Sequence, residues 1–371
     1  MLIVMIKSLK IRLKPNKTQE NQLYKSANIA RFVYNWTLGR QIENYKQGNK
    51  FISDNTLRKE ITQLKKSELS FLSEVSNNVA KQSVKDCCTA YKNFFNKTSK
   101  FPRFKSKKKS KLSFYNDNVK LKSKGKKVLI EKVGWVGTSE EIPQGKYMNP
   151  RISYDGKYWY LSVSMEFEKP DIILGDEKLG IDLGIKDLAI CSNNKVYKNI
   201  NKTKKVKQVK KRLKRKQRQV SRKYIKNKEG NRYVKTANIL KLEKQMKLLH
   251  RKLSNIRQNY LHQVTKDIVK TKPYQINIED LNIKGMMKNK HLSKAIQEQG
   301  VYTFTKYLGY KCEWYGIKLV KIDRWYPSSK TCNKCGTIKS DLKLSDRVFK
   351  CECGYVEDRD VNASYNIRDY I

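Results

Sequence analysis

The stretch Lys178–Ile190, KLGIDLGIKDLAI, determines the fold we expect for the second half of the chain. It is typical of an apolar strand, and it carries one carboxylate, Asp182, in its middle. Burying an unpaired carboxylate is costly, so an acid retained in a Leu/Ile run indicates a cation bound beside it. Asp182 is therefore the first candidate metal ligand.

Two later segments repeat this combination of apolar residues and acids. Tyr274–Leu281, YQINIEDL, is predicted to be a strand that closes on Glu279 and Asp280. Glu357–Ala363, EDRDVNA, brings Asp358 and Asp360 to the start of the last predicted helix. Distant acid-bearing elements can converge if strands of one sheet bring their ends together, and converging carboxylates are what Mg²⁺ prefers.

A single acid near a helix start has a simpler explanation, because such acids commonly cap the helix dipole. The hypothesis therefore depends on three acids taken together. They are Asp182, Glu279 and Asp360.

The charge balance points to a polyanionic partner. The chain has 371 residues, enough for two or three domains, and its 38% hydrophobic content is enough to bury real cores. It carries 82 Lys and Arg against 34 Asp and Glu, a formal net charge of +48. A membrane surface is the alternative, but the cations are interleaved with Tyr and Trp as in base-stacking surfaces, which favours nucleic acid.

The sequence predicts an intracellular protein. No apolar run approaches the length of a membrane span, and the opening MLIVMI is followed at once by Lys7, which leaves no room for a signal-peptide core. We therefore expect no membrane association and a cytoplasmic location.

Four of the eight cysteines form a metal-binding pattern. Cys332-x-x-Cys335-Gly and Cys351-x-Cys353-Gly have the spacing of a zinc ribbon, and each pair is followed by a glycine that allows a tight turn. Four thiolates fill all positions of a tetrahedral ion, so we expect one structural Zn²⁺.

The first half of the chain predicts an α+β arrangement. Met5–Lys14 alternates as a strand, three helices follow to about Lys97, and strands return from Lys111 to Glu168 with a hairpin folded at Asp155-Gly156. The first strand and the later strands are expected to form a small β-barrel that is split in sequence by the helical insertion.

Two basic segments are candidate nucleic-acid contacts. In FPRFKSKKK (Phe101–Lys109), a solvated linker anchored by its aromatic rings is the simpler alternative to a base-stacking segment. Lys202–Lys228 holds 15 Lys or Arg in 27 residues and no acid, in the first helix of a predicted helical hairpin at 202–270. A merely solvated face is the alternative to phosphate contact there. The residues singled out are Phe101, Arg103, Phe104 and Lys105, and Lys211, Arg212, Lys214 and Arg215.

Several motifs together resemble the TnpB family of transposon-encoded RNA-guided DNA endonucleases, which are related to type V CRISPR effectors. They are GIDLGIKDLAI, IEDL, YPSSKTCNKCG and CECGYVEDRDVNASYNI, with ARFVYNW, LSEV, AYKNFF and FPRFK nearer the N-terminus. The resemblance implies an α+β multidomain protein. Its parts would be a wedge β-barrel (1–14 and 110–172), a helical recognition insert (15–109) and a ribonuclease-H-like RuvC domain (173–371) with a zinc ribbon at 328–357.

The same resemblance implies the chemistry and the partners. The family's catalytic acids fall on Asp182, Glu279 and Asp360, which would hold two Mg²⁺ ions. The partners would be a guide RNA from the end of the mobile element, with one protein per RNA, and double-stranded target DNA in the bacterial cytoplasm at the nucleoid. Residues matching those that meet the short motif beside the target are Asn77, Lys81, Tyr115 and Asn116.

Two rival functions remain open. A guide-dependent DNA-binding regulator without cleavage is expected to have lost at least one acid, and all three are present. A DNA strand-transfer transposase is the other rival. His250, His262 and His291 form no H-x-H pair and no HNH module, so we interpret them as ordinary surface or helix residues.

Overall fold

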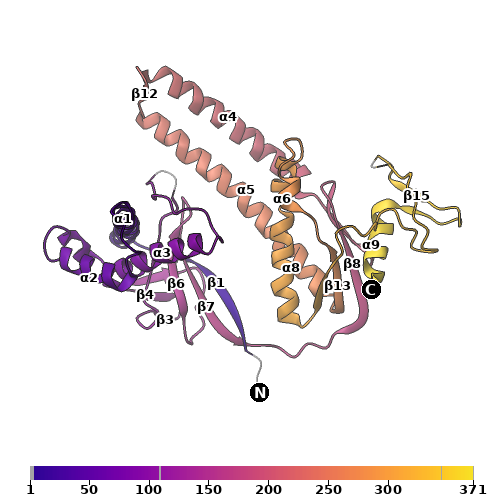
Figure 1. Cartoon of the computed structure of the whole chain (residues 1–371), viewed down its shortest axis with the longest axis horizontal. Helices are drawn as coiled ribbons and strands as arrows, with labels where there is room; N and C mark the ends of the chain where they lie inside the picture. The colour runs from indigo at the N-terminus through magenta and orange to yellow at the C-terminus, as the bar shows by residue number, and fades with distance from the viewer. Residues whose placement is uncertain (1–3, 108–109, 344, 371) are drawn as a thin grey trace. The chain divides into compact units, whose positions relative to one another are not determined.

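The computed structural model describes residues 4–107, 110–343 and 345–370, which fall into two compact units, Met1–Glu168 and Lys169–Ile371 (Figure 1). Residues 1–3, 344 and 371 of the predicted domains, and Lys108 and Lys109 of the predicted basic segment, lie outside the described residues. Within the described ranges, the chain forms no helix with the length and apolarity needed to cross a membrane.

The first unit contains a seven-stranded sheet in the order β2-β6-β7-β1-β5-β4-β3, with every neighbouring pair antiparallel. The N-terminal strand is central, because β1 pairs with β7 along most of its length and with β5 at its end. The strands are β1 (Val4–Lys14), β2 (Ser113–Tyr115), β3 (Lys122–Lys124), β4 (Lys127–Ile130), β5 (Gly134–Thr138), β6 (Met148–Tyr154) and β7 (Trp159–Glu168).

The helices of this unit lie between β1 and β2 in sequence. Asn16 begins the first helix with a capping box formed with Gln19, which satisfies two backbone N–H groups. Apolar residues of α1 and α3 share one core with the sheet, including Leu23, Val84 and Trp159. The helices are α1 (Lys17–Lys46), α2 (Asp54–Leu64), the 3-10 turn η1 (Ser70–Glu74) and α3 (Asn77–Phe95).

The predicted barrel differs from the structure in one respect. The seven strands form an open sheet, since no ladder among the described residues joins the edge strands β2 and β3. Both edge strands are three residues long, which offers few backbone groups for closing the sheet. The sheet is nonetheless split in sequence by the helices, as expected.

The second unit contains a five-stranded sheet in the order β10-β9-β8-β13-β14. Strands β10, β9 and β8 pair antiparallel, whereas β8, β13 and β14 are parallel. Its strands are β8 (Gly175–Leu183), β9 (Asp187–Cys191), β10 (Val196–Lys198), β13 (Pro273–Glu279) and β14 (Lys318–Ile322). The segment Lys178–Ile190, predicted as one strand, is therefore a tight hairpin that turns at Gly184–Lys186.

Helices complete this unit. Helices α4 and α5 form the long predicted hairpin, capped at their N-termini by Thr203 and Thr236. The C-terminal part of α5 packs with α8 against the sheet. The helices are the 3-10 turn η2 (Ile200–Lys202), α4 (Lys204–Lys226), α5 (Ala237–Val269), α6 (Ile283–Met286), α7 (Ser293–Gln299), α8 (Val301–Tyr315) and α9 (Arg359–Asp369).

Two small hairpins remain. One joins α4 to α5 and consists of β11 (Lys228–Glu229) and β12 (Arg232–Tyr233), turning at Gly230. The other lies in the cysteine-rich module and consists of β15 (Val348–Lys350) and β16 (Val356–Asp358).

Candidate active site and metal centre

Alternation along two parallel strands places two of the predicted acids on one face of the sheet. Leu179, Ile181 and Leu183 of β8 pack into the core with α5 and α8, so Gly180 and Asp182 belong to the opposite face. Asp182 directly follows Ile181, which pairs with Ile278, and Glu279 directly follows Ile278. The two carboxylates therefore stand on neighbouring strands near the ends of those strands.

Helix α9 brings the third acid to the same face. A Cβ atom at Gly180 would lie 2.0 Å from the carbonyl oxygen of Ser364, so α9 rests directly on the backbone of β8. On β13, Nδ2 of the fully buried Asn277 donates to the carbonyl oxygens of Ile367 (3.0 Å) and Arg368 (3.1 Å). These contacts fix α9, whose second residue is Asp360.

The electrostatics show that the three acids interact. Burial raises the pKa of Asp182 well above its usual range, and the charges of Glu279 and Asp360 raise it further. Burial also raises the pKa of Glu279, although the hydroxyl of Ser328, which donates to Oε1 at 3.0 Å, opposes this. No lysine or arginine of the described chain lies within ion-pair distance of the three carboxylates.

A partly buried group of carboxylates that forms no ion pair, and in which only the charge of Arg359 opposes the raised pKa of Asp182, suits divalent cations. The three acids do not form a tight single-ion cage, because within the described residues only the cysteine group has three or more ligand atoms within 4.8 Å of one another. A two-ion site spreads its ligands around ions that are about 3.5–4 Å apart, so ligand atoms more than 4.8 Å apart are compatible with such a site.

The neighbouring acids are engaged elsewhere. Asp280 pairs with Arg324 and with Lys321 (3.4 Å), and Arg324 in particular lowers its pKa. Asp358 is the N-cap of α9, where its Oδ1 accepts from the backbone N–H of Asp360 at 2.9 Å and of Val361 at 3.3 Å. Asp280 and Asp358 therefore have structural partners that Glu279 and Asp360 lack. From the sequence, the two members of each adjacent pair are distinguished mainly through the family resemblance.

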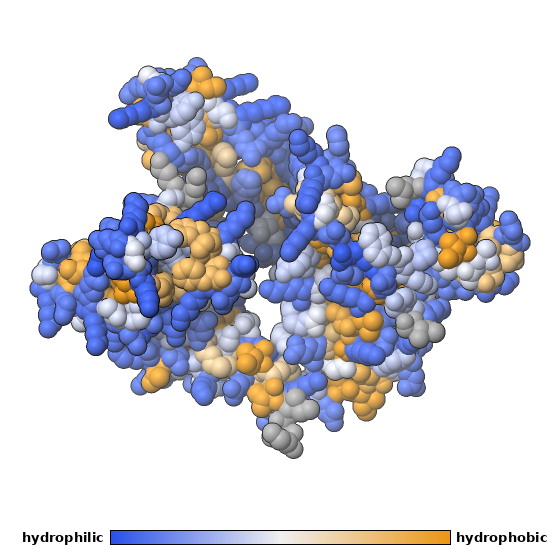
Figure 2. All heavy atoms as spheres, viewed as in Figure 1, coloured by the Kyte–Doolittle hydropathy of each residue, from blue (hydrophilic) through white to orange (hydrophobic). Residues whose placement is uncertain are grey.

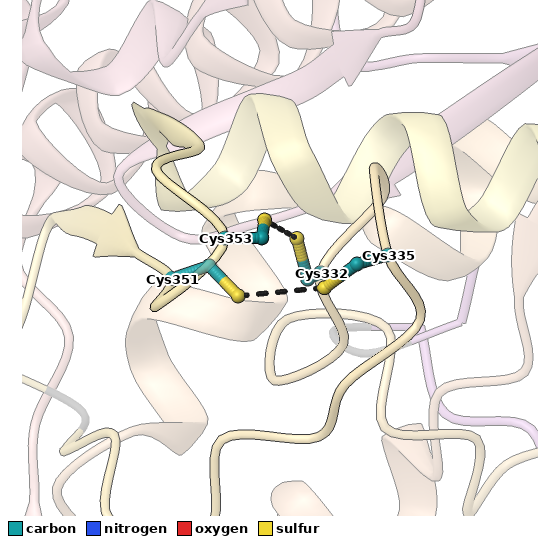
Figure 3. Close-up of side chains that lie close together, drawn as sticks. All are labelled: Cys332, Cys335, Cys351 and Cys353. Carbon is teal, nitrogen blue, oxygen red and sulfur yellow. Dashed lines mark hydrogen bonds between the residues drawn. The ribbon is translucent and has the colours of Figure 1, made fainter.

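The four predicted zinc ligands converge (Figure 3). The sulfur atoms of Cys332 and Cys353 are 3.7 Å apart, and those of Cys335 and Cys351 are 3.5 Å apart. Gly336 and Gly354 adopt positive φ angles of 76° and 82°, the conformation expected of the turn after each pair. Thr337, whose hydroxyl lies 3.3 Å from the Cys335 sulfur, lowers the pKa of that thiol to about 6.

This donor set fits a structural zinc ion. Four thiol groups within 4.8 Å of one another match tetrahedral S₄ coordination, and all four positions are supplied by protein.

Family models match most of the chain. Residues 162–290 match a family described as "Probable transposase" (OrfB_IS605), residues 302–367 match "Cas12f1-like, TNB domain", and residues 1–50 match a "Helix-turn-helix domain" of the OrfB group. The chain is 32% identical over 367 residues to a Streptomyces pristinaespiralis protein named "Putative RNA-guided DNA endonuclease", covering 97% of this chain and 88% of that protein. It is also 25% identical over 411 residues to the mimivirus "TnpB-like protein L79", covering 98% of this chain and 73% of that protein.

This chain belongs to the TnpB family. A further relative, from Escherichia coli K12, is named "Putative RNA-guided DNA endonuclease InsQ" and is 31% identical, with 98% of this chain and 91% of that protein covered. The fold is also similar to a chain solved in "Cryo-EM structure of the Cas12f1-sgRNA-target DNA complex", with a TM-score of 0.61, 15% identity and 99% of both chains covered.

The duplex-motif residues expected from the TnpB resemblance have different surroundings. Asn77 and Lys81 are exposed on α3, where Lys65 donates to Asn77. The partly buried Tyr115 donates to Asn118 at 3.2 Å. Asn116 is buried, and its side chain holds the backbone of Glu131 (3.0 Å) and Asp117 (2.9 Å). The structure therefore gives Asn116 a positioning role and directs its side chain into the protein.

The FPRFK segment of this TnpB-family chain also contains both residues that contact the protein and residues that face solvent. Phe101 packs edge-on against Tyr91 and Phe94, and the ammonium of Lys105 lies 3.5 Å from the ring centre of Tyr34. Burial lowers the pKa of Lys105. Phe101 and Lys105 thus make the ring contacts that the anchoring alternative expects, although 45% of the Phe101 surface is exposed, as are Arg103 and Phe104.

The basic residues of α4 lie on its outer surface. Val206, Val209, Leu213 and Val220 form the buried stripe, and the predicted contacts Lys211, Arg212, Lys214 and Arg215 are all exposed. Figure 2 shows the α4–α5 hairpin covered largely by hydrophilic side chains.

Several positioning residues were missed by the sequence analysis. Asn366 donates to the carbonyl oxygens of Ser328 (2.7 Å) and Thr331 (2.6 Å), and Asn362 donates to Thr331 (2.8 Å). These bonds join α9 to the start of the cysteine module. The signal was a pair of asparagines at i and i+4 in DVNASYNI, which places both on one helix face.

Proposed function

We propose that this TnpB-family chain is an RNA-guided DNA endonuclease that cleaves double-stranded DNA at a Mg²⁺-dependent site formed by Asp182, Glu279 and Asp360. The observation that carries the proposal is the mutual repulsion of three neighbouring carboxylates, with no Lys or Arg of the described residues in an ion pair with them; only the more distant charge of Arg359 lowers the pKa of Asp182. The names of the relatives support the activity. The sheet order β10-β9-β8-β13-β14, with α9 on the acid-bearing face, supports a ribonuclease-H-like RuvC domain.

The reaction is hydrolysis of a phosphodiester. A water oxygen attacks phosphorus, the P–O3′ bond breaks, and the products are a 5′-phosphate and a 3′-hydroxyl, with the proton balance completed by solvent. Two bound Mg²⁺ ions would supply charge stabilisation for the attacking and leaving oxygens. Asp182 and Glu279 project from adjacent strands and Asp360 from the first turn of α9, so the three side chains hold fixed positions around the scissile phosphate.

The zinc module supports this site through position. Cys332, Cys335, Cys351 and Cys353 would hold one Zn²⁺ as a closed structural centre. Ser328, the first residue of this module, hydrogen-bonds Glu279, and Asn366 of α9 donates to the carbonyl oxygen of Ser328. Bound zinc would thus stabilise the segment that orients one carboxylate and the helix that carries another.

A guide RNA and target DNA are the proposed partners. A net charge of +48 exceeds what a short duplex contact neutralises, since typical DNA-binding proteins make about 6–10 phosphate contacts. A long RNA accounts for the surplus, and the exposed cations of α4 are suited to its backbone. We propose that the guide comes from the end of a bacterial mobile element, that one protein binds one RNA, and that the complex acts in the cytoplasm at the nucleoid. The exposed Asn77 and Lys81, on the recognition helices beside the wedge sheet, would contact the motif that flanks the target.

Adjacent acids give matched variants for the test. In the guide complex, Glu279→Gln and Asp360→Asn should reduce Mg²⁺-dependent cleavage of a matched plasmid by about a hundred- to a thousandfold or more, since losses of 10²–10³ are seen when one charge-stabilising group is removed. The neighbouring Asp280→Asn and Asp358→Asn should keep cleavage within about tenfold, because those acids form ion pairs and a helix cap.

Target binding in a gel-shift assay should persist in all four variants. Wild-type cleavage by Glu279→Gln would contradict the proposed site. Binding without cleavage by the wild-type complex in Mg²⁺ would favour the rival regulator, and joining of DNA ends in place of cutting would favour a transposase.

A further inference from the structure

A cavity of about 290 Å³ adjoins the carboxylate group on the side of α8. Glu279 and Asp280 line it at the end of β13, Tyr302 and Lys306 line it from α8, and Lys321 lines it from β14. Glu279 therefore borders both the acid group and this cavity.

The lining combines two chemistries. Leu183 and Val301 are buried and give the cavity an apolar wall, whereas Lys306 and Lys321 are exposed cations at its edge. Tyr302 has 70% of its surface exposed and no ring partner among the described residues, so its ring is free to stack on a ligand at the cavity. A nucleotide has matching chemistry, because its base is flat and largely apolar on both faces and its phosphate is anionic.

We propose that this cavity is a subsite for a nucleotide of the DNA strand being cut, next to the scissile phosphate. Tyr302 stacks on the base, and Lys306 and Lys321 hold a neighbouring phosphate. This inference rests on the proposed nuclease function and deepens it, since it adds residues that position the strand beside Asp182, Glu279 and Asp360.

The cations are available for this role. Lys321 is about half exposed and lies 3.4 Å from Asp280, which Arg324 also pairs, so Asp280 keeps a partner when Lys321 turns toward a phosphate. Exposed ion pairs of this kind are weak and exchange readily.

The test combines Tyr302 variants with abasic substrates. Single-turnover cleavage is measured for the wild-type guide complex, Tyr302→Ala and Tyr302→Phe, on matched targets with one abasic nucleotide at successive positions around the cut. Loss of one base–aromatic stack should slow cleavage by about 5- to 100-fold in Tyr302→Ala. The cleavage rate of Tyr302→Phe should remain near that of the wild type, and both variants should bind the target normally. At one position, an abasic nucleotide should slow cleavage by the wild type but should not slow Tyr302→Ala further.

Tyr45 and Lys318 provide the controls. Tyr45 is 80% exposed on α1 in the other unit, so Tyr45→Ala should cleave like the wild type. Lys318 is exposed on β14 but does not line the cavity, so Lys306→Ala should slow cleavage more than Lys318→Ala.

Three outcomes separate the subsite from the function. The subsite is overturned if Tyr302→Ala cleaves like the wild type, or if the slowing caused by Tyr302→Ala and by the abasic nucleotide is additive at every position. Either result leaves the nuclease assignment intact. Full activity of Asp182→Asn, measured in parallel, overturns the nuclease assignment itself. Loss of Asp182→Asn activity together with a non-additive Tyr302 effect supports both.

Discussion

The hydroxyl of Ser328 donates a 3.0 Å hydrogen bond to Oε1 of Glu279, and its carbonyl oxygen accepts one of 2.7 Å from Nδ2 of Asn366 on α9. One buried serine therefore links the strand that carries one candidate metal ligand to the helix that carries another. Ser328 lies four residues before Cys332, so its position depends on the cysteine module.

Removing this hydroxyl should change the pH dependence of cleavage. Burial raises the pKa of Glu279 and the Ser328 hydroxyl lowers it, so Ser328→Ala should raise that pKa further. A proton competes with Mg²⁺ for the carboxylate, so the loss should be largest at low pH. At pH 6 and limiting Mg²⁺ we expect cleavage to fall about 10- to 150-fold, the range for one hydrogen bond to a charged group, with a smaller loss at pH 8.

Single-turnover rates between pH 5.5 and 8.5 provide the measurement. Ser340→Ala removes an exposed hydroxyl from the same module and should leave the profile unchanged. A loss that is equal at every pH would show that Ser328 acts only through the fold.

The contact between β8 and α9 predicts a severe effect at Gly180. A Cβ there would lie 2.0 Å from the Ser364 oxygen and 2.4 Å from the Arg368 nitrogen, and backbone atoms cannot move aside as a flexible side chain can. Gly180→Ala should displace α9 with Asp360, destabilise the second unit by at least about 1–3 kcal/mol, and abolish most cleavage. Thermal unfolding and plasmid cleavage measure the two effects.

Gly309→Ala is the matched control. Gly309 lies inside α8, and its added Cβ would meet only Leu319 Cδ2 at an ordinary 3.8 Å. This variant should be neutral or more stable by up to about 1 kcal/mol, the usual helix preference for Ala over Gly. Equal stability of the two variants would contradict the close packing of α9.

Removal of zinc should impair cleavage through the fold. Cys332→Ser should lower the zinc content from one ion per chain and destabilise the C-terminal module, because structural zinc supplies folding free energy. Cleavage should fall as α9 loses its support, while the first unit remains folded. Cys191→Ala, a change at a buried cysteine outside the cluster, should leave the zinc content of the protein unchanged. Metal analysis that finds no zinc in wild-type protein purified without chelators would exclude the ribbon.

The partly desolvated ammonium of Lys311 should make the stability of the protein depend on pH. Its ammonium donates to the carbonyl oxygen of His262 and to Thr265 Oγ1, both at 2.6 Å, and burial lowers its pKa to about 8. An unfolded lysine has a pKa of about 10.4, so between these values the unfolded chain binds more protons. The contribution of Lys311 to the free energy of unfolding should therefore rise with pH across this window.

The difference between wild type and Lys311→Met isolates this contribution, since the other titrating groups are common to both. Denaturant unfolding at pH 7.5, 8.5 and 9.5 should show the wild type gaining stability relative to the variant. A difference that stays constant over this range would contradict a charge buried at Lys311.

Much of the site could be predicted because its chemistry is local in sequence. The spacing of Cys332, Cys335, Cys351 and Cys353 with their glycines predicts a metal cluster directly, and the structure confirms that the four sulfurs converge. The capping residues Asn16, Thr203 and Thr236 begin helices for the same local reason.

Features that depend on distant partners could not be predicted. Nothing near Asp280 in sequence shows that Arg324 and Lys321 pair with it, so without the family resemblance it could not be told from Glu279. The roles of Asn277, Asn366 and Ser328 likewise depend on contacts made across the fold. The resemblance implied that Asn116 meets the motif beside the target, but its side-chain oxygen accepts from the backbone N–H of Glu131.

Guide dependence tests the central claim most directly. The protein should be expressed with and without the flanking RNA-coding end of its element, and each preparation assayed for cleavage of a plasmid that carries the matched target. The account predicts co-purifying RNA, Mg²⁺-dependent cleavage only with the guide, and a cut that moves when the guide segment is changed. Equal cleavage by both preparations, independent of the guide sequence, would contradict it.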